Sequence, residues 1–324
     1  MPTVSVVIPT YDRADVLPRA MDSALGQTVA DLELVVVDDG STDDTEAVVA
    51  DYDDDRVRYV AHERNRGANV ARNTGVEAAD GEYVAFLDSD DEWKPTKLER
   101  QLDRLDGEDD WVAAYCGFER AATDPTARAE SAVAGLLARA DDDDRPTEGG
   151  EELAGEILAG HLHPGAGSTL VVETAVARSI GGFDESLDRF QDPDIVLRIL
   201  REGPVAHVDA PLVVRHDTGA PAAETVAAAD REYLEKHDEA VERAEDRGLD
   251  VRGTHDLLLA KSYLAEGAVG PGLRHLSGAT VPARHVPGLA WAAVGGVRRR
   301  SGRGTAMAGA LAFVALVGVL ARRR

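Results

Sequence analysis

Short apolar runs alternate with helix-like segments through the first hundred residues. The runs with strand character are Val4–Pro9, Leu32–Val37, Val57–Ala61 and Tyr83–Leu87. Apolar residues at helical spacing lie between them, in Arg13–Leu25, Asp43–Tyr52, Gly67–Ala79 and from Pro95 to about Leu105. Continuous β-branched runs are typical of parallel strands that are buried on both faces. The pattern therefore predicts an α/β fold, a doubly wound and mostly parallel sheet with helices on both faces.

The pattern is less regular beyond residue 110. Trp111–Phe118 predicts a buried strand, whereas residues 119–150, rich in Ala, Asp and Arg, predict a solvated insertion. Further elements are expected near Glu151–Leu158 (helix), Ser168–Val172 (strand), Asp192–Glu202 (helix), Val205–Val208 and Leu212–Val214 (strands), and Ala222–Arg247 and Thr254–Glu266 (amphipathic helices). Ser41 or Thr42 is placed to cap the helix that follows the second strand.

The C-terminal segment has a different pattern. Thr305–Ala321 is an uncharged run of 17 residues, about 26 Å long as a helix and at the short end for crossing a bilayer. Arginine clusters flank it on both sides, and a helix that is apolar all round lies either in lipid or deep in a core. We therefore expect residues 285–324 to associate with a membrane, with Leu289–Val297 at the interface.

The distribution of charged residues supports the same division of the chain. Asp and Glu number 60 and Lys and Arg 35, which gives a formal charge of −25. Residues 267–324 contain nine arginines and no acidic residue, so the rest of the chain is more negative still. Such a charge argues against polymeric nucleic acid as a partner. With four lysines among the 35 basic residues, the composition is typical of halophile proteins, although an acidic protein from a GC-rich genome is the alternative.

The cysteine content and the N-terminal sequence indicate where in the cell the protein is expected. The single cysteine, Cys116, excludes an intramolecular disulfide and a cysteine-based zinc site, and its apolar surroundings predict a packed thiol. No charged segment followed by a long apolar stretch begins the chain, so we predict no signal peptide. We expect the acidic part to lie in the cytoplasm, at the cytoplasmic face of the membrane if the C-terminus anchors it.

Polar residues follow three of the predicted strands directly. They are Thr10–Asp12, Asp38–Ser41 and Asp88–Asp91. Because the carboxyl ends of parallel strands meet at one edge of a sheet, these groups are expected to converge. Carboxylates there suit Mg²⁺ or Mn²⁺ and the departure of a diphosphate group. No P-loop or dinucleotide fingerprint is present. Chance or helix capping is the alternative for a single acidic pair at a strand end, and Asp39 could simply precede a cap.

Six stretches of the sequence resemble one known family. They are Val4–Arg13 (VSVVIPTYDR), Ser23–Thr28 (SALGQT), Leu34–Asp43 (LVVVDDGSTD), Asn65–Gly67 (NRG), Ala71–Gly75 (ARNTG) and Phe86–Trp93 (FLDSDDEW). They resemble the family 2 glycosyltransferases of the GT-A fold. The resemblance is dense over residues 3–105, looser over 165–217, and does not extend to the C-terminal segment.

The resemblance implies inverting transfer of a sugar from a nucleotide diphosphate sugar, usually with uracil as the base. It implies that Pro9, Thr10 and Tyr11 line the base pocket, that Asp39 accepts a hydrogen bond from the base, that Arg72 lies near the diphosphate, that Asp88 approaches the ribose or metal, and that Asp90 ligates the metal. His216, in the pair Arg215–His216, matches a position that can be a metal ligand; a surface histidine is the alternative.

A second motif supplies the implied catalytic base. Gly181–Glu185 (GGFDE) followed by Phe190–Arg198 (FQDPDIVLR) resembles the acceptor-side motif, in which Asp192 matches the base. Gln191 stands where Glu is more usual, and Pro193 where an aromatic residue is frequent. A carboxylate that merely stabilises a helix N-terminus is the alternative reading of Asp192.

These inferences define four regions and one principal function. Residues 1–110 are expected to bind the nucleotide sugar, 111–220 the acceptor, 221–284 to form a helical extension and 285–324 to contact the membrane. The predicted enzyme is a metal-dependent hexosyltransferase that acts on a glycan or lipid-linked acceptor in protein glycosylation, lipid-linked glycan or cell-surface polysaccharide synthesis. A sugar-1-phosphate nucleotidyltransferase and a non-catalytic nucleotide-sugar-binding relative are the alternatives.

Overall fold

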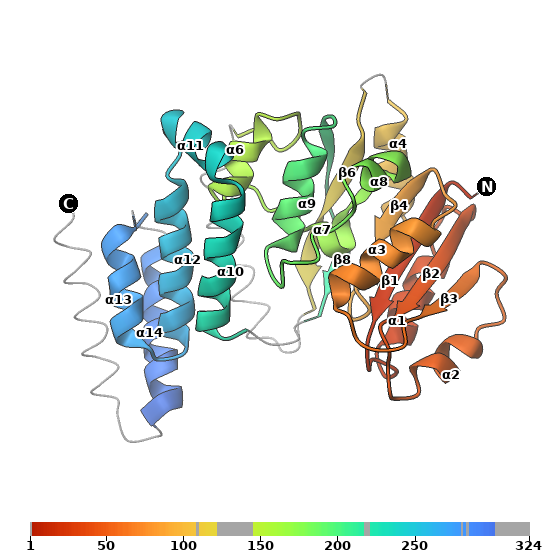
Figure 1. Cartoon of the computed structure of the whole chain (residues 1–324), viewed down its shortest axis with the longest axis horizontal. Coiled ribbons are helices and arrows are strands. Elements are labelled where there is room, and N and C mark those ends of the chain that lie inside the picture. The colour runs from red at the N-terminus through yellow and green to blue at the C-terminus, as the bar shows by residue number, and fades with distance from the viewer. Residues whose placement is uncertain are drawn as a thin grey trace. The chain divides into compact units, whose positions relative to one another are not determined.

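The computed structural model describes residues 2–107, 110–121, 145–216, 221–279, 281–282 and 285–301. The chain forms two compact units, drawn in Figure 1: unit 1 contains Met1–Ala154 and His163–Thr218, and unit 2 contains Gly155–Leu162 and Gly219–Arg324. Both of the halves predicted within residues 1–220 therefore contribute to unit 1. The four predicted boundaries themselves stay predictions.

An eight-stranded sheet of order β3-β2-β1-β4-β7-β6-β8-β5 forms the centre of unit 1. The strands are β1 (Val4–Thr10), β2 (Leu32–Asp38), β3 (Val57–Ala61), β4 (Tyr83–Phe86), β5 (Glu92–Trp93), β6 (Ala113–Arg120), β7 (Val171–Glu173) and β8 (Val205–Arg215). The first four are parallel, as expected. β6 and β8 are also parallel, whereas β7 is antiparallel to both β4 and β6, and β5 is antiparallel to β8. The sheet is therefore mixed, with four parallel and three antiparallel pairings among the described strands.

Helices cover both faces of this sheet, as predicted. They are α1 (Leu17–Leu25), α2 (Thr45–Ala50), α3 (Ala68–Ala78), α4 (Lys97–Leu105), α7 (Ala166–Thr169), α8 (Thr174–Ser179) and α9 (Gln191–Ile199). Val4, Val6 and Ile8 share one apolar cluster with buried residues of α1 and α4. Val7 points to the other face, where α3 approaches so closely that a Cβ on Gly75 would lie 2.2 Å from Val7 Cγ1. The alternation of side chains along β1 thus places the two helix layers.

Three local predictions differ from the structure. Residues 168 and 169 belong to the short helix α7, because the Thr169 hydroxyl donates to the carbonyl of Pro164 (2.5 Å) and closes a turn. β8 is one strand rather than two, because its partner β6 shifts register at Gly117 and so accommodates the interruption before Pro211. Asp44, not Ser41 or Thr42, stands at the N-cap of α2.

Unit 2 is helical. It contains α10 (Ala223–Lys236), α11 (Asp238–Asp246), α12 (Val251–Ala265), α13 (Val269–Gly278), α14 (Val286–Ser301) and most of α6 (Leu153–Leu158). The predicted helix Ala222–Arg247 is divided at His237. In the part of the chain that the structure describes, no helix is long and apolar enough to span a membrane. Thr305–Ala321 and most of the predicted insertion lie outside the described residues.

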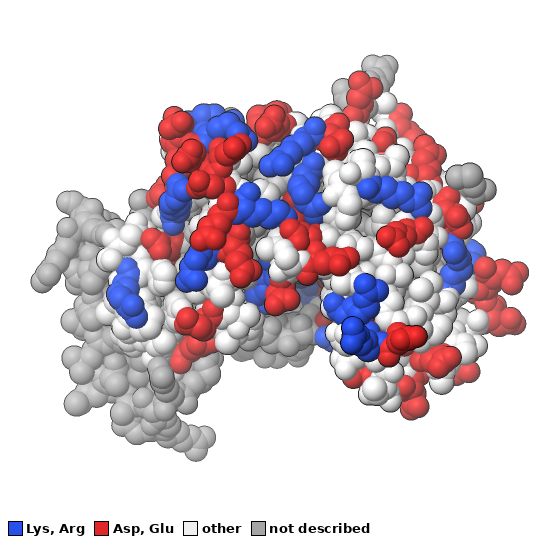
Figure 2. Space-filling view, viewed as in Figure 1, with Lys and Arg blue, Asp and Glu red and all other residues white. Residues whose placement is uncertain are grey.

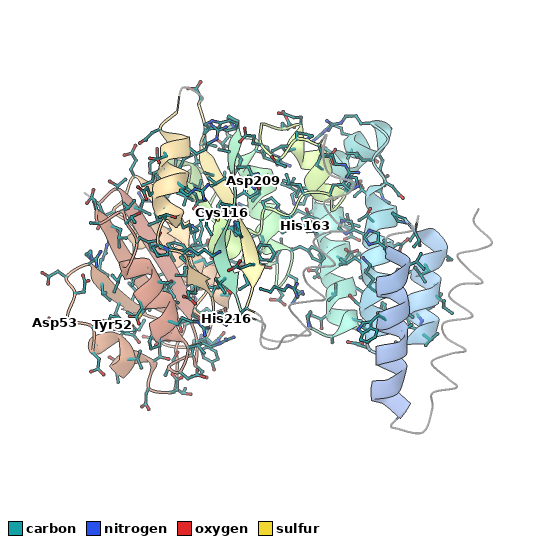
Figure 3. All side chains as sticks on the ribbon, turned by 180° about the vertical axis from the view of Figure 1, so that it is seen from behind. Tyr52, Asp53, Cys116, His163, Asp209 and His216 are labelled. Carbon is teal, nitrogen blue, oxygen red and sulfur yellow. The ribbon has the colours of Figure 1, made fainter. Side chains whose placement is uncertain are left out.

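Negative charge is spread over the face of the molecule that Figure 2 draws. Figure 2 shows acidic side chains on the drawn face of both units, interspersed with arginine and lysine. Inside unit 1, Cys116 is 2% exposed, which confirms the prediction of a packed thiol. Figure 3 shows its position in the sheet.

Lys97 is a buried charge that the sequence pattern does not reveal. Its ammonium group lies 3.8 Å from the centroid of the Trp93 ring, and Nζ has no hydrogen-bond partner among the described residues. Burial lowers the pKa of Lys97 to about 8. The unfolded chain keeps this proton up to about pH 10.4. Stability is therefore reduced below pH 8 and rises with pH between about 8 and 10.4, where the unfolded state binds more protons.

We predict that Lys97→Met raises the free energy of unfolding at pH 7 by about 1–3 kcal/mol, because it removes a buried, unpaired charge. Urea unfolding at pH 7 and pH 9.5 measures this, and the gain should shrink at the higher pH. Lys94→Met is the control, since Lys94 is part-exposed and pairs with Glu119. A loss of stability in Lys97→Met at pH 7 would mean that the contact with Trp93 outweighs the burial of the charge.

Candidate active site

A cavity of about 420 Å³ lies at the carboxyl ends of β1, β2 and β4. Its lining consists of Pro9, Thr10, Tyr11, Arg13, Asp39, Asn65, Gly67, Ala68, Ala71, Arg72, Asp88, Ser89 and Asp90. All six residues predicted to bind the nucleotide sugar are present, together with the predicted metal ligand Asp90. The structure thus brings these seven together, whereas the predicted residues Asp192 and His216 are not part of this lining.

The loop after β1 forms one wall of the cavity. The side chain of Tyr11 is exposed, while Thr10 is buried and its hydroxyl has no hydrogen-bond partner among the described residues. The next residue, Asp12, has a φ of 49°. Its amide donates to Ser41 Oγ (2.9 Å), and its carboxylate accepts from the amide of Thr42 (2.7 Å). The loops after β1 and β2 therefore hold each other in place.

Asp39 is buried at the end of β2 and holds a third loop. Its carboxylate accepts hydrogen bonds from the amides of Arg66 (2.9 Å) and Gly67 (2.7 Å), and it lies 2.7 Å from His62 Nδ1. Gly40 allows that loop to approach, because a Cβ there would lie 2.6 Å from the carbonyl carbon of Arg64. The N-cap of α2 is Asp44, five residues after Asp39. Sequence reasoning missed His62, which has no local signal.

Arg72 reaches the cavity from α3. It is 5% exposed, and its guanidinium donates to Asp88 Oδ1 (2.6 Å) and to Asn69 Oδ1 (3.0 Å). It also lies 5.1 Å from the centroid of the Phe183 ring, in the GGFDE motif. The pKa of Arg72 is raised, since the neighbouring carboxylates of Asp88, Asp192 and Asp90 outweigh its burial. Arg72 is therefore a fixed positive charge beside three carboxylates.

Asp91, which the sequence analysis did not single out, joins three segments. Its carboxylate accepts from Ser168 Oγ (2.6 Å) and from the amide of His216 (3.3 Å), and it lies 3.8 Å from Arg215 Nε. Ser168 Oγ in turn accepts from the amide of Asp88 (3.1 Å). Burial and the nearby Asp88 raise the pKa of Asp91 to about 6. The sequence signal that could have identified Asp91 is its position in the acidic run Asp88–Asp91.

His216 follows the end of β8 and is labelled in Figure 3. Its Nε2 is buried, has no hydrogen-bond partner among the described residues, and lies 3.9 Å from Glu92 Oε2. An unpartnered imidazole nitrogen is available as a ligand or a hydrogen-bonding group.

Asp192 lies in the first turn of α9, and its Oδ1 is buried without a hydrogen-bond partner among the described residues. Burial raises the pKa of Asp192, and Asp88 raises it further, while Arg72 and Arg215 act against this change. These charge interactions place Asp192 near the Arg72–Asp88 pair. A carboxylate with a raised pKa and a free oxygen is suited to accept a proton.

The carboxylates that line the cavity indicate which kind of divalent ion the site could hold. Asp88 and Asp90 present carboxylates to the same cavity, although no group of three His, Cys, Asp or Glu in the described ranges gathers as a metal cage. Mg²⁺ is usually held by one or two carboxylates together with substrate phosphates rather than by such a cage. The donor set therefore fits an ion that binds together with a diphosphate.

Fold and cavity define a class of protein: an α/β domain with a cavity and acidic motifs at the carboxyl ends of its parallel strands. Residues 5–149 match the family described as Glycosyl transferase family 2. This match covers less than half of the chain and agrees with the sequence resemblance.

Curated relatives and a solved structure are also similar to this chain. An uncharacterized glycosyltransferase of Rickettsia typhi is 34% identical over 203 residues, covering 62% of this chain and 59% of the relative. UDP-Glc:alpha-D-GlcNAc-diphosphoundecaprenol beta-1,3-glucosyltransferase WfgD of Escherichia coli is 40% identical over 102 residues, 32% of this chain and 40% of that protein. Mannosyltransferase PcManGT from Pyrobaculum calidifontis, in complex with GDP-Man and Mn²⁺, has the same fold with a TM-score of 0.59 and 18% identity, covering 100% of this chain and 88% of that one.

The matches cover only part of these relatives. The alignment spans 59% of the length of the Rickettsia typhi protein and 40% of WfgD.

Proposed function

We propose that this protein is an inverting, metal-dependent glycosyltransferase that moves a hexose from a nucleotide diphosphate sugar, with UDP the preferred carrier, to an acceptor hydroxyl. The observation that carries the proposal is the single cavity lined by all seven residues expected at the donor. Pro9, Thr10, Tyr11 and Asp39 then hold the base, and Arg72 supplies positive charge near the diphosphate. Asp88 and Asp90 would hold Mg²⁺ or Mn²⁺, with His216 as a further candidate ligand.

Asp192 is the proposed base. Inversion is a single displacement at the anomeric carbon, so the acceptor hydroxyl must lose its proton on the face opposite the leaving diphosphate. The free, buried oxygen of Asp192 suits that proton transfer. The divalent ion supplies charge stabilisation to the diphosphate when it is bound. Arg72 donates to Asp88 and adds a buried positive charge beside it.

The acceptor and location extend this proposal. We propose a glycan or lipid-linked acceptor, because the sequence places an apolar, arginine-flanked segment at residues 305–321. The names of relatives such as WfgD, which acts on a diphosphoundecaprenol-linked sugar, agree with that choice. Anchoring at the cytoplasmic face of a membrane, and a halophile source, rest on the sequence pattern alone.

A donor screen tests the proposal. UDP-, GDP- and TDP-sugars are titrated calorimetrically with Mn²⁺ or Mg²⁺, at low and at molar salt. We expect one nucleotide class to bind at least about tenfold more tightly than the others (about 1.4 kcal/mol), because a hydrogen-bonding base pocket rejects wrong partners. Asp88→Asn should weaken that binding, and Asp53→Asn, outside the cavity lining, should not.

The same sample separates the two alternatives. Incubation with a nucleoside triphosphate and a sugar 1-phosphate would release pyrophosphate from a nucleotidyltransferase. A non-catalytic relative would bind the selected nucleotide sugar but would transfer no sugar to any acceptor and release no nucleoside diphosphate. Absence of binding by every nucleotide sugar would contradict the proposed function itself.

A further inference from the structure

Arg13 lines the donor cavity, although its sequence position predicts no role there. Its guanidinium NH1 lies 3.2 Å from Asp90 Oδ2, where Asp90 is the expected metal ligand. The side chain of Arg13 is 38% exposed and that of Asp90 is 19% exposed. The cavity lining therefore contains two arginines, Arg13 and Arg72, and each is paired with one of the two carboxylates expected to hold the ion.

The backbone around Arg13 is fixed from both sides. Asp12 before it has a φ of 49°, a left-handed conformation that a residue with a side chain adopts at an energetic cost. The loop after β2 holds this conformation through Asp12 and through the amide of Ala14, which donates to Asp43 Oδ2 (3.0 Å). The base of the Arg13 side chain is thus set, and only its flexible end can turn.

The two arginines differ in their freedom to move. Arg72 is 6% exposed at its side chain and is bound to both Asp88 and Asn69. Among the described residues, the side chain of Arg13 is bound to Asp90 alone, and it is partly open to solvent. A nearby third arginine, Arg19, binds the main-chain carbonyl of Asp90 (2.6 Å) and leaves the carboxylate to Arg13.

An ion pair and a metal bond compete for the same oxygen. A divalent cation at Asp90 Oδ2 would repel the guanidinium and take over its acceptor. The displaced group would remain in the cavity in which the diphosphate is expected, and a guanidinium is well matched to phosphate oxygens. We propose that Arg13 is an exchangeable counter-ion: it holds Asp90 before loading and turns to the donor diphosphate when the cation takes Asp90. The proposal rests on the proposed function of the cavity.

The exchange has a thermodynamic consequence. A cation that binds alone must break the Arg13–Asp90 pair without replacing it. A cation that binds with a nucleoside diphosphate leaves Arg13 a new partner, so each ligand should strengthen the binding of the other by the same factor. Removal of Arg13 should therefore strengthen the binding of the cation alone. It should weaken the binding of the diphosphate and reduce the factor by which each ligand strengthens the binding of the other.

Calorimetric titration of Arg13→Gln in the full chain tests this. We expect Mn²⁺ alone to bind about 2–5-fold more tightly than in the unchanged protein, the range of a partly exposed ion pair. We expect UDP to bind more weakly in the presence of Mn²⁺, and the factor by which UDP strengthens Mn²⁺ binding to fall by about fivefold or more. Arg13→Lys should restore part of the coupling, because it keeps the charge without the planar fork.

Arg56→Gln is the matched control. Arg56 pairs with Asp54 (2.8 Å) outside the cavity lining and should change neither affinity nor coupling. Unchanged Mn²⁺ affinity and unchanged coupling in Arg13→Gln would overturn the exchange, even if UDP binds well. Failure of the unchanged protein to bind any nucleoside diphosphate would instead overturn the proposed function, so the two failures are distinguishable. GDP replaces UDP in each titration if the donor screen selects it.

Discussion

Asp192→Asn is expected to lower kcat by about 10²–10⁴-fold, the usual contribution of a general base. Asparagine keeps the size of the side chain but cannot take the proton of the acceptor hydroxyl. Affinity for the nucleotide sugar should change by less than about threefold, since Asp192 is not part of the donor cavity lining. Initial rates with the donor selected by the screen, together with calorimetric donor binding, measure the two quantities separately.

The pH dependence provides a second test of the base. Burial and the nearby Asp88 raise the pKa of Asp192 above the ordinary Asp value of about 3.9. The base is inactive when protonated, so kcat should fall as the pH drops through that raised pKa. The acid limb should disappear from any residual activity of Asp192→Asn. Asp188→Asn, an exposed neighbour before α9, is the control. Full turnover in Asp192→Asn would show that another group removes the proton.

The donor cavity could be predicted from the sequence because its residues follow strands directly. Thr10, Asp39 and Asp88 each come just after an apolar run, and parallel pairing of β1 with β2 and β4 brings the three strand ends together. Strand-end position is a local property of the chain. Because the strands are parallel, the residues that follow them lie at the same edge of the sheet and form one site.

The contacts that hold the cavity together have no comparable signal. Asp91 meets Ser168 and His216, which are 77 and 125 residues further along the chain. His62 contacts Asp39 across 23 residues, and only the folded arrangement of the loops pairs them. Arg72 was expected at the diphosphate by resemblance, but its bond to Asp88 depends on the packing of α3 against β1.

The second half of the sheet was harder to predict for a related reason. β7 has three residues and β5 has two, and both are antiparallel to their neighbours. Strands this short carry almost no periodicity, so their direction is set by tertiary packing rather than by local pattern. The antiparallel pairings and the helix at residues 166–169 follow from that packing.

Asp39→Ala is expected to destabilise the protein by about 3–5 kcal/mol and to abolish measurable nucleotide binding. The substitution leaves the buried amides of Arg66 and Gly67 and the ring of His62 without their shared acceptor. Loss of one partner in a buried charged network costs this much because the remaining polar groups stay desolvated. Urea unfolding and calorimetric titration with the selected nucleotide measure the two losses.

The combination of the two losses identifies what Asp39 does. If Asp39 only contacted the nucleotide base, Asp39→Ala would lose nucleotide binding without a loss of stability. If Asp39 only held the loop, an Asp39→Ala variant that still folds would keep its nucleotide binding. Asp39→Asn refines the test, because its Oδ1 still accepts one amide while its Nδ2 opposes the other, so an intermediate loss of stability is expected. Asp44→Ala, at the N-cap of α2 without a side-chain bond there, should stay within about 0.5 kcal/mol of the unchanged protein. Because Asp39 fixes residues 66 and 67 while itself lining the cavity, loop order and base recognition should be lost together; unchanged stability in Asp39→Ala would contradict that link.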